Sequence, residues 1–229
     1  MWHDKGYKNY YLDKLRAILC SCYSKNKRFK GKIIMTNREQ FEEIYFTHIT
    51  RAGSTELLEW LKKTDFFTAP ASTRFHCACA GGLLQHSINV YQVLRERHFE
   101  KSIDNEESFA ICGLLHDICK TQFYRESIRN VKNDETGQWE KQPYYSVEDS
   151  FPYGHGEKSV FMIERFLRLK TSEAVAIRWH MGGFDDSVRG GSFSISLAYD
   201  KYPLAVKLHL ADLEATYLRE KGTSSVPRK

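Results

Sequence analysis

Six histidine and aspartate residues lie in apolar or glycine-flanked stretches, where polar side chains need a specific reason. They are His86, His116, Asp117, His155, His180 and Asp212. Asp117 follows His116 in the most apolar segment of the chain, and burying its carboxylate is costly unless a cation or hydrogen-bond donor compensates the charge. Imidazole and carboxylate groups together suit iron, manganese, nickel, cobalt or zinc, but not an all-oxygen calcium site. The set therefore predicts a site for one or two divalent transition metal ions.

The periodicity of apolar residues places these six residues on several different helices. Helices are expected over residues 36–49, 55–63, 83–97, 106–120, 156–169, 172–181 and 203–220. Residues 123–147 are rich in aromatic and β-branched residues around a turn at 133–137, which indicates a β-hairpin. Residues 182–194 contain four glycines and are expected to form a loop. The predicted fold class is all-α, a helical bundle with a small β-hairpin insertion, and bundle interiors commonly hold metal sites.

Charge divides the chain unevenly and suggests its domain organisation. Residues 1–32 carry a net charge of +7, whereas the remainder carries −2. We predict a basic N-terminal helix and linker over 1–34, one domain over 35–220 with its core at 70–220, and a flexible tail over 221–229. The basic arm could attract nucleic acid, although a solvated helix followed by a mobile basic loop is the favoured interpretation. Without a signal peptide or a long apolar run, we expect a cytoplasmic protein with no membrane partner.

The order of the six residues resembles a known signature. The pattern H…HD…H…H…D, with the local words GGLLQHS (81–87), LLHDICK (114–120) and LHLAD (208–212), is similar to the HD superfamily of metal-dependent phosphohydrolases. It resembles in particular the HD domains of bacterial 3′→5′ exoribonucleases and of uncharacterised firmicute and phage HD proteins. The likeness covers roughly residues 70–220, and it implies the all-α HD fold.

The resemblance also implies a role for each residue. His86, His116, Asp117 and Asp212 would hold one metal ion, and His155 and His180 would hold a second, with Asp117 bridging the two. Several dinuclear relatives carry paired histidines near the fifth position, where this chain has Trp179-His180-Met181. The second site is therefore predicted to be the weaker one.

Three further roles concern the substrate. Asp117 and Lys120 are predicted to be catalytic, with Asp117 also positioning the attacking water. Lys120 and Arg74 are predicted to bind phosphate, and Trp179 to stack against a nucleobase. Each of these has a simpler alternative, as a surface charge or a packing residue.

The predicted function is metal-dependent phosphohydrolysis, by a phosphomonoesterase or phosphodiesterase acting through a metal-activated water. The expected substrate is a phosphorylated small molecule: a nucleotide, a dinucleotide or a short nucleic-acid end. Two alternatives stay open at this point. Some HD proteins are mixed-valent di-iron oxygenases with the same ligand pattern, and a regulatory or binding module could hold metal without turnover. The sequence leaves the substrate, the metal and the oligomeric state open.

Overall fold

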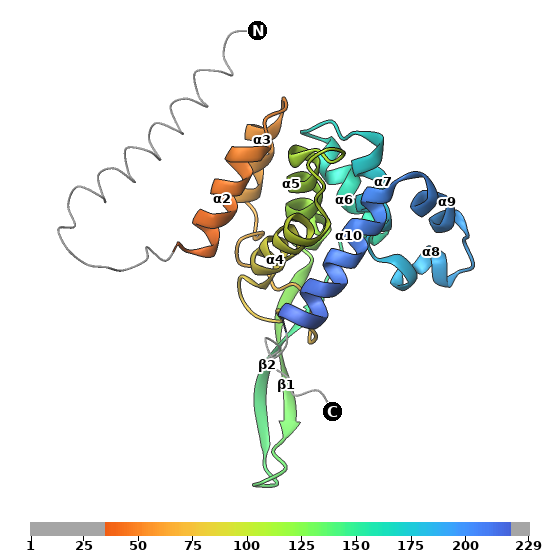
Figure 1. Ribbon diagram of the computed structural model, residues 1–229. Helices are drawn as coiled ribbons and strands as arrows, with labels where there is room; N and C mark the ends of the chain where they lie inside the picture. The colour runs from red at the N-terminus through yellow and green to blue at the C-terminus, as the bar shows by residue number, and fades with distance from the viewer. Residues whose placement is uncertain (1–34, 221–229) are drawn as a thin grey trace, which may run out of the picture. The chain divides into compact units, whose positions relative to one another are not determined.

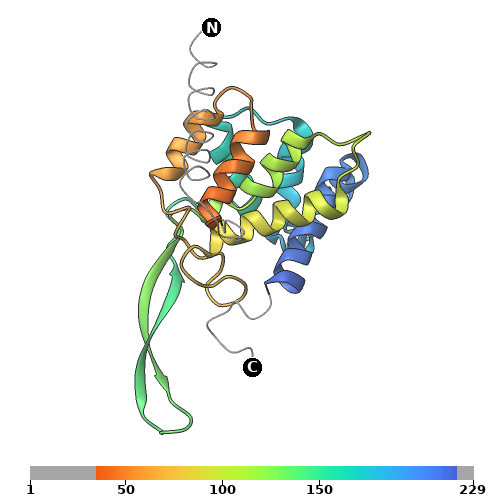
Figure 2. The ribbon, with the colours of Figure 1, turned by 60° about the vertical axis from the view of Figure 1, so that its left-hand side comes forward.

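The computed structural model describes residues 35–220, and these form a helical domain with one two-stranded sheet. Figures 1 and 2 show the helices gathered in one body from which the two strands project. In chain order the elements are α2 (Asn37–His48), α3 (Ser54–Lys62), α4 (Gly82–His98), α5 (Glu106–Leu115), the short 3₁₀ helix η1 (Ile118–Lys120), β1 (Tyr124–Lys132), β2 (Trp139–Val147), α6 (His155–Glu164), α7 (Thr171–Trp179), η2 (Gly182–Phe184), α8 (Asp186–Arg189), α9 (Ser194–Lys201), α10 (Pro203–Glu214) and η3 (Ala215–Arg219). The all-α prediction with a hairpin insertion is confirmed. The predicted basic arm and C-terminal tail lie outside the described residues.

Local sequence signals account for several helix starts. Helix α2 begins after Thr36, whose side chain accepts from the backbone of Glu39 while the Glu39 carboxylate accepts from the backbone of Thr36. This is the reciprocal capping arrangement that satisfies two backbone donors at a helix N-terminus. Helix α10 begins at Pro203, where a missing backbone N–H costs nothing.

The core surrounds α5, which is apolar on all sides from Phe109 to Leu115 and buried from Ser108 onward. Helix α4 crosses it closely at Gly113, where a Cβ atom would lie 2.6 Å from the Cα atom of Tyr91. Only glycine permits that approach, which fixes how far His86 on α4 lies from the end of α5. Helices α7 and α10 pack against the same core and complete the bundle (Figure 1).

Helix α5 is shorter than predicted. The sequence indicated one helix over 106–120, but α5 ends at Leu115 and a separate 3₁₀ turn follows. His116 keeps helical angles, whereas Asp117 has φ −104° and ψ 18°, in the bridge region between helix and strand where active-site residues often lie. The helix breaks where His116 and Asp117 turn toward the histidines of other helices. Tertiary contacts cause this break, and the periodicity of apolar residues along the sequence does not reveal it.

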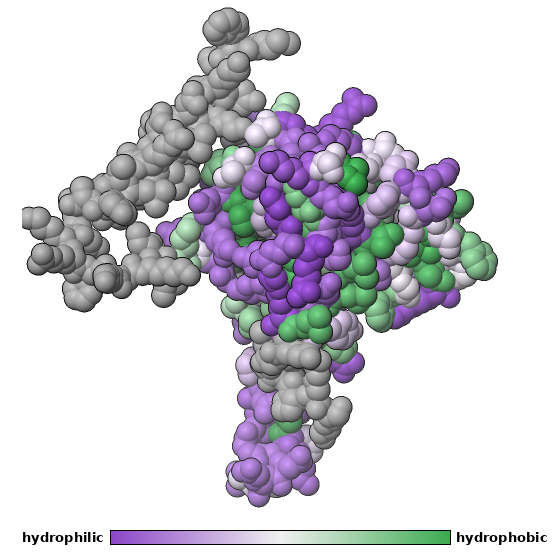
Figure 3. Space-filling view, viewed as in Figure 1, coloured by the Kyte–Doolittle hydropathy of each residue, from purple (hydrophilic) through white to green (hydrophobic). Residues whose placement is uncertain are grey.

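The predicted hairpin is confirmed, and it lies away from the core. Its strands pair antiparallel from Tyr124 opposite Val147 to Lys132 opposite Trp139, and the projecting part is mostly hydrophilic in Figure 3. Ile128 and Trp139 are both 70% exposed. At its base, the Tyr124 hydroxyl donates to the carbonyl of Ala71, which ties the hairpin to the segment before α4.

The predicted loop over 182–194 contains more structure than its glycines suggested. It includes η2, the single turn α8 and the first residue of α9. Beyond α10, the chain continues through a π-helical turn, η3, instead of the plain α-helix expected up to residue 220. Within residues 35–220, no helix has the length and apolar character needed to cross a bilayer.

Candidate metal centre

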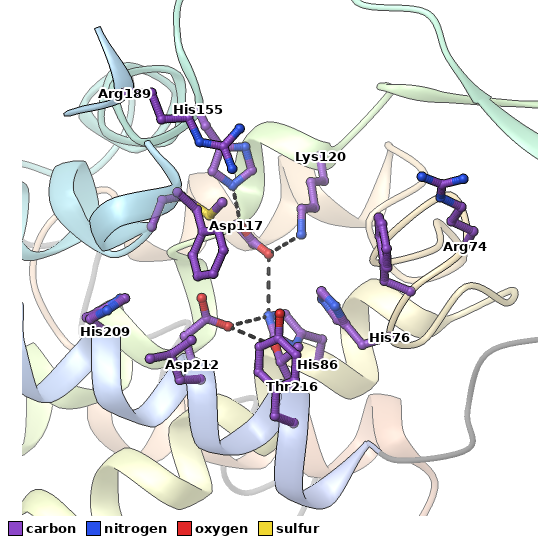
Figure 4. A pocket seen from close by; sticks show the side chains of 15 residues that line it. Arg74, His76, His86, Asp117, Lys120, His155, Arg189, His209, Asp212 and Thr216 are labelled. Atoms are coloured by element: carbon purple, nitrogen blue, oxygen red, sulfur yellow. Dashed lines mark hydrogen bonds and ion pairs between the residues drawn. The ribbon is translucent and has the colours of Figure 1, made fainter. Parts of the chain in front are cut away.

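The six predicted ligands come together from five parts of the chain. Four of them, His86, Asp117, His155 and Asp212, line one cavity, and His116 and His180 are fully buried. His86 comes from α4, His155 begins α6, and Asp212 comes from α10. His116 and Asp117 follow α5, and His180 directly follows α7. The cavity has a volume of about 1040 Å³, and Figure 4 shows the side chains that line it.

Two overlapping clusters share Asp117. In what we call the first cluster, His86, His116 and Asp212 face one another, with 3.3 Å between the two Nε2 atoms and 3.2 Å from His86 Nε2 to Asp212 Oδ1. In the second cluster, His155 Nε2 lies 2.8 Å and His180 Nε2 3.4 Å from Asp117 Oδ1. Oδ2 of Asp117 points instead to the first cluster, 3.4 Å from His86 Nε2. The two oxygens of one carboxylate therefore serve two different histidine groups.

Backbone and carboxylate partners determine which nitrogen of each imidazole is available. His116 Nδ1 lies 3.0 Å from the carbonyl oxygen of Gly113, and His180 Nδ1 lies 2.7 Å from that of Ile177. A carbonyl only accepts, so in both rings Nδ1 donates and a neutral ring keeps a lone pair on Nε2. His86 Nδ1 faces the carboxylate of Glu220 at 3.1 Å, which favours the same tautomer. Three Nε2 atoms thus converge on the carboxylates in the orientation that metal ligands require.

The charges of the centre call for a cation. Burial disfavours ionised Asp117 and Asp212. Lys120 and the nearby histidines outweigh burial at Asp117, and the histidines alone do so at Asp212, so both pKa values lie below the usual range of aspartate. Burial lowers the pKa of His116 to about 3, so this ring is neutral. Burial also opposes charge on His86, but Glu220, Asp117 and Asp212 outweigh it and raise its pKa well above the ordinary value. The buried carboxylates of Asp117 and Asp212 thus favour a cation beside the histidine Nε2 atoms, whether a proton or a metal ion.

The residues present fit a transition metal ion. His180 Nε2 is buried and has no hydrogen-bond partner among the described residues, although leaving a buried polar atom unpaired is costly. Groups of histidine and carboxylate atoms that all lie within 4.8 Å of one another include His86 with His116 and Asp212, and His116 with Asp117 and His180. This donor set has the nitrogen and oxygen chemistry of iron, manganese, cobalt, nickel or zinc sites.

The predicted substrate residues have different placements. Lys120 and Arg74 both line the cavity, and Lys120 is 9% exposed with its Nζ atom 2.6 Å from Asp117 Oδ2. Trp179 is not among the lining residues; its ring lies against the guanidinium of Arg178 at 4.0 Å. The structure thus brings Lys120 and Arg74 to the cavity and leaves Trp179 outside it.

Three residues complete the centre without having been predicted to belong to it. Glu220 contacts His86, and the Cys119 Sγ atom lies 3.4 Å from His155 Nδ1. Near them, His76 stacks beside His86 with 4.7 Å between ring centroids, and its Nε2 atom is buried without a partner in the described part of the chain. Nothing in the sequence around Glu220 or Cys119 marks either residue as part of the site. His76 lies among apolar residues before α4, which is only a weak indication of a functional role.

Comparison with known proteins agrees with this geometry. The family model of the HD domain matches residues 83–216, which include all six predicted ligands. No curated protein matches the chain, and no solved structure does. Because the family match spans more than half of the chain and contains the assembled centre, the chain belongs to the HD domain family, whose members are typically metal-dependent phosphohydrolases.

Proposed function

We propose that this protein hydrolyses a phosphate ester of a nucleotide, a dinucleotide or a short nucleic-acid end at the cavity over Asp117. The observation that supports it most is the position of Lys120, a buried cation that lines the cavity directly beside the proposed metal ligands. A phosphoryl group that reaches the ligands would also reach this ammonium group. A centre that binds metal for structural reasons alone has no need of such a charge at its open side.

Each residue of the centre has a role in this proposal. His86, His116, Asp117 and Asp212 would hold one metal ion, and His155 and His180 a second, with Asp117 between them. Bound there, a divalent metal ion supplies Lewis acidity toward phosphoryl oxygens and a water of lowered pKa.

The protein's own groups orient the substrate around this centre. Asp117 presents oxygens to both clusters and can position the attacking water, since it is held by His155 at 2.8 Å and by Lys120 at 2.6 Å. Lys120 neutralises charge that develops on the phosphoryl group. Arg74 binds phosphate at the cavity wall, where its planar guanidinium can contact two oxygens.

The rim of the cavity supports a nucleotide as the esterified group. Phe75, Phe184 and Tyr217 line the cavity and are 55%, 49% and 49% exposed, so their rings are accessible for stacking. Arg74 lies over the Phe75 ring at 5.0 Å, and Arg189 lies near Phe184 at 6.0 Å. Aromatic faces beside guanidinium groups bind bases and phosphates together. The cavity volume, about 1040 Å³, is at the upper end of the range for small-molecule sites.

The deciding experiment combines metal analysis with a substrate panel. Protein purified without oxygen is analysed for metal, then assayed with nucleoside mono-, di- and triphosphates, dinucleotides and short oligonucleotides, with added manganese, iron, cobalt, nickel or zinc. Metal-dependent release of phosphate or mononucleotide, abolished by Asp117→Ala, supports the proposal. Two iron ions with oxygen consumption and no hydrolysis would favour a di-iron oxygenase instead. Bound metal without turnover on any substrate would favour a binding module.

A further inference from the structure

The last described residue, Glu220, has a buried carboxylate that reaches one proposed ligand from behind. The side chain is 1% exposed, and its two oxygens lie 3.1 and 3.2 Å from His86 Nδ1. The Asn89 amide, one turn further along α4, donates to the same carboxylate at 2.8 Å. A buried carboxylate is unfavourable unless it is paired and hydrogen-bonded, so its position demands an explanation.

A change in helix type delivers this carboxylate. Helix α10 ends at Glu214, and the next turn is π-helical, with the backbone N–H of Glu220 donating to the carbonyl of Ala215 at 3.0 Å. Such an i to i+5 turn inserts one extra residue, and π turns are frequent at functional sites. The extra residue changes which side of the helix Glu220 occupies, and here that side faces α4.

We propose that Glu220 is a positioning residue that orients His86 and strengthens its Nε2 atom as a ligand for a divalent transition metal ion. The inference rests on the metal centre proposed above. A carboxylate that accepts from the second nitrogen of a ligating imidazole fixes the ring orientation and tautomer, and increases ligand basicity.

The other histidines of the centre give an internal comparison. His116 and His180 have neutral backbone carbonyls at Nδ1, at 3.0 and 2.7 Å. His86 alone among these three rings has an anionic partner there. Because a carboxylate withdraws the Nδ1 proton more strongly than a carbonyl does, the His86 nitrogen becomes the strongest neutral donor of the three. His86 therefore differs from His116 and His180 in the strength of its Nε2 atom as a ligand, although all three are histidines.

Glu220 also lies beyond the residues that match the family model, which end at 216. The contact between Glu220 and His86 therefore comes from the end of η3, outside the part by which the chain was assigned to its family. It couples that turn to the metal centre through a single side chain.

The test is direct titration of metal-free protein with Mn²⁺ by calorimetry, and with Co²⁺ by visible absorption, in the wild type and in Glu220→Gln. The glutamine keeps the shape and can still accept from His86, but it lacks the charge. We expect the affinity of the first metal to fall about 10- to 100-fold in Glu220→Gln, with altered Co²⁺ absorption bands. Glu220→Asp should recover part of the loss if charge is the cause.

A matched control separates this effect from a general weakening of the helix by loss of a glutamate charge near its end. Glu214, the last residue of α10, forms ion pairs with Arg97 at 2.9 Å and His98 at 3.6 Å, and none of the three lines the cavity. Glu214→Gln should leave the metal affinity unchanged. Circular dichroism and thermal unfolding in chelator should show that Glu220→Gln is folded.

The outcomes distinguish the inference from the function on which it rests. Wild-type affinity and unchanged Co²⁺ bands in folded Glu220→Gln would overturn the positioning role while leaving the metal centre intact. No metal binding by the wild-type protein would overturn both. Should Glu220→Gln be unfolded without metal, the same titration on Asn89→Ala decides the question. This variant removes the amide that donates to the carboxylate, together with the acceptor for Gln85, and unchanged metal affinity there counts against the proposal.

Discussion

The Nζ atom of Lys120 lies 2.6 Å from Oδ2 of Asp117, the oxygen that faces the first cluster. The lysine therefore shares an acceptor with the proposed metal ion. Burial disfavours the charged amine, but Asp117 outweighs it and raises the pKa of Lys120 above its usual value. An ammonium group persists at the cavity floor, available to a phosphoryl group once metal binds the carboxylate.

Replacing Lys120 by methionine should separate turnover from metal binding. We expect turnover of the best substrate to fall about 100-fold or more, as for loss of a group that stabilises developing charge. Metal affinity should stay equal or increase, because a competing cation has been removed from Asp117. Steady-state kinetics and metal titration measure the two effects. Lys207→Met is the control. Lys207 lies on α10, pairs with Asp104 at 2.7 Å and does not line the cavity, so its loss should change neither turnover nor metal affinity.

Because Asp117 contacts both clusters, we expect its substitution and the substitution of Asp212 to differ in how much bound metal is lost. Asp117→Asn should lower occupancy of both clusters, because each cluster uses one of its oxygens. Asp212→Asn should weaken only the first cluster, since Asp212 lies against His86 and is grouped with His116. Elemental analysis after equilibration with Mn²⁺ measures the difference. Equal metal loss in the two variants would contradict the division into two clusters.

That the six predicted ligands come together could be predicted because their identity and order carry information that does not depend on exact geometry. His155 and His180, which were predicted to share a metal site with Asp117, do lie beside it, although one begins a helix and the other directly follows a different helix. What the sequence could not provide were the deviations from regular helix. The bridge conformation of Asp117 and the π turn before Glu220 depend on tertiary contacts, and local propensity averages over them.

Side chains at the periphery were harder to predict than the ligands. Trp179 precedes the predicted ligand His180 in the sequence, yet helix geometry turns adjacent residues about 100° apart, and its ring packs against Arg178 outside the cavity. Phe75 and Tyr217, which do line the cavity, come from segments that no motif marked. The apolar pattern identified the core helices but did not report which aromatic residues border an opening.

Close helix packing predicts a variant that damages the centre without touching a ligand. In Gly113→Ala the new Cβ would meet the backbone of Tyr91 at 2.6 Å, so α4 and α5 must separate. Overpacking of this kind costs about 1 to 3 kcal/mol, more than the roughly 1 kcal/mol gained from replacing a helical glycine. Denaturant unfolding should show a net loss of stability, and Mn²⁺ affinity should fall because His86 moves from His116. Gly183→Ala, with open space around its Cβ, is the control.

A buried ion pair remote from the centre predicts how stability depends on pH. Arg51 binds Glu173 through two guanidinium nitrogens at 2.7 and 2.8 Å, and Glu173 is fully buried. Burial opposes its ionisation, but Arg51 and Ser108 outweigh it and hold its pKa below the usual value. A carboxyl with a lowered folded-state pKa stabilises the protein above its unfolded pKa, about 4.3, and loses that contribution as pH falls through the folded value.

Arg51→Met leaves this carboxylate buried without its main partner, which should cost about 3 to 5 kcal/mol at pH 7. The difference from wild type should shrink as the pH falls from 7 toward 3, because burial without Arg51 raises the pKa of Glu173 in the variant and protonation removes the unpaired charge. Urea unfolding in chelator, between pH 7 and pH 3, measures both effects without a contribution from metal. Arg38→Met breaks an exposed pair with Glu42 and should cost at most about 0.5 kcal/mol at any pH. A constant difference between Arg51→Met and wild type across this pH range would show that lost packing, not the charge of Glu173, causes the destabilisation.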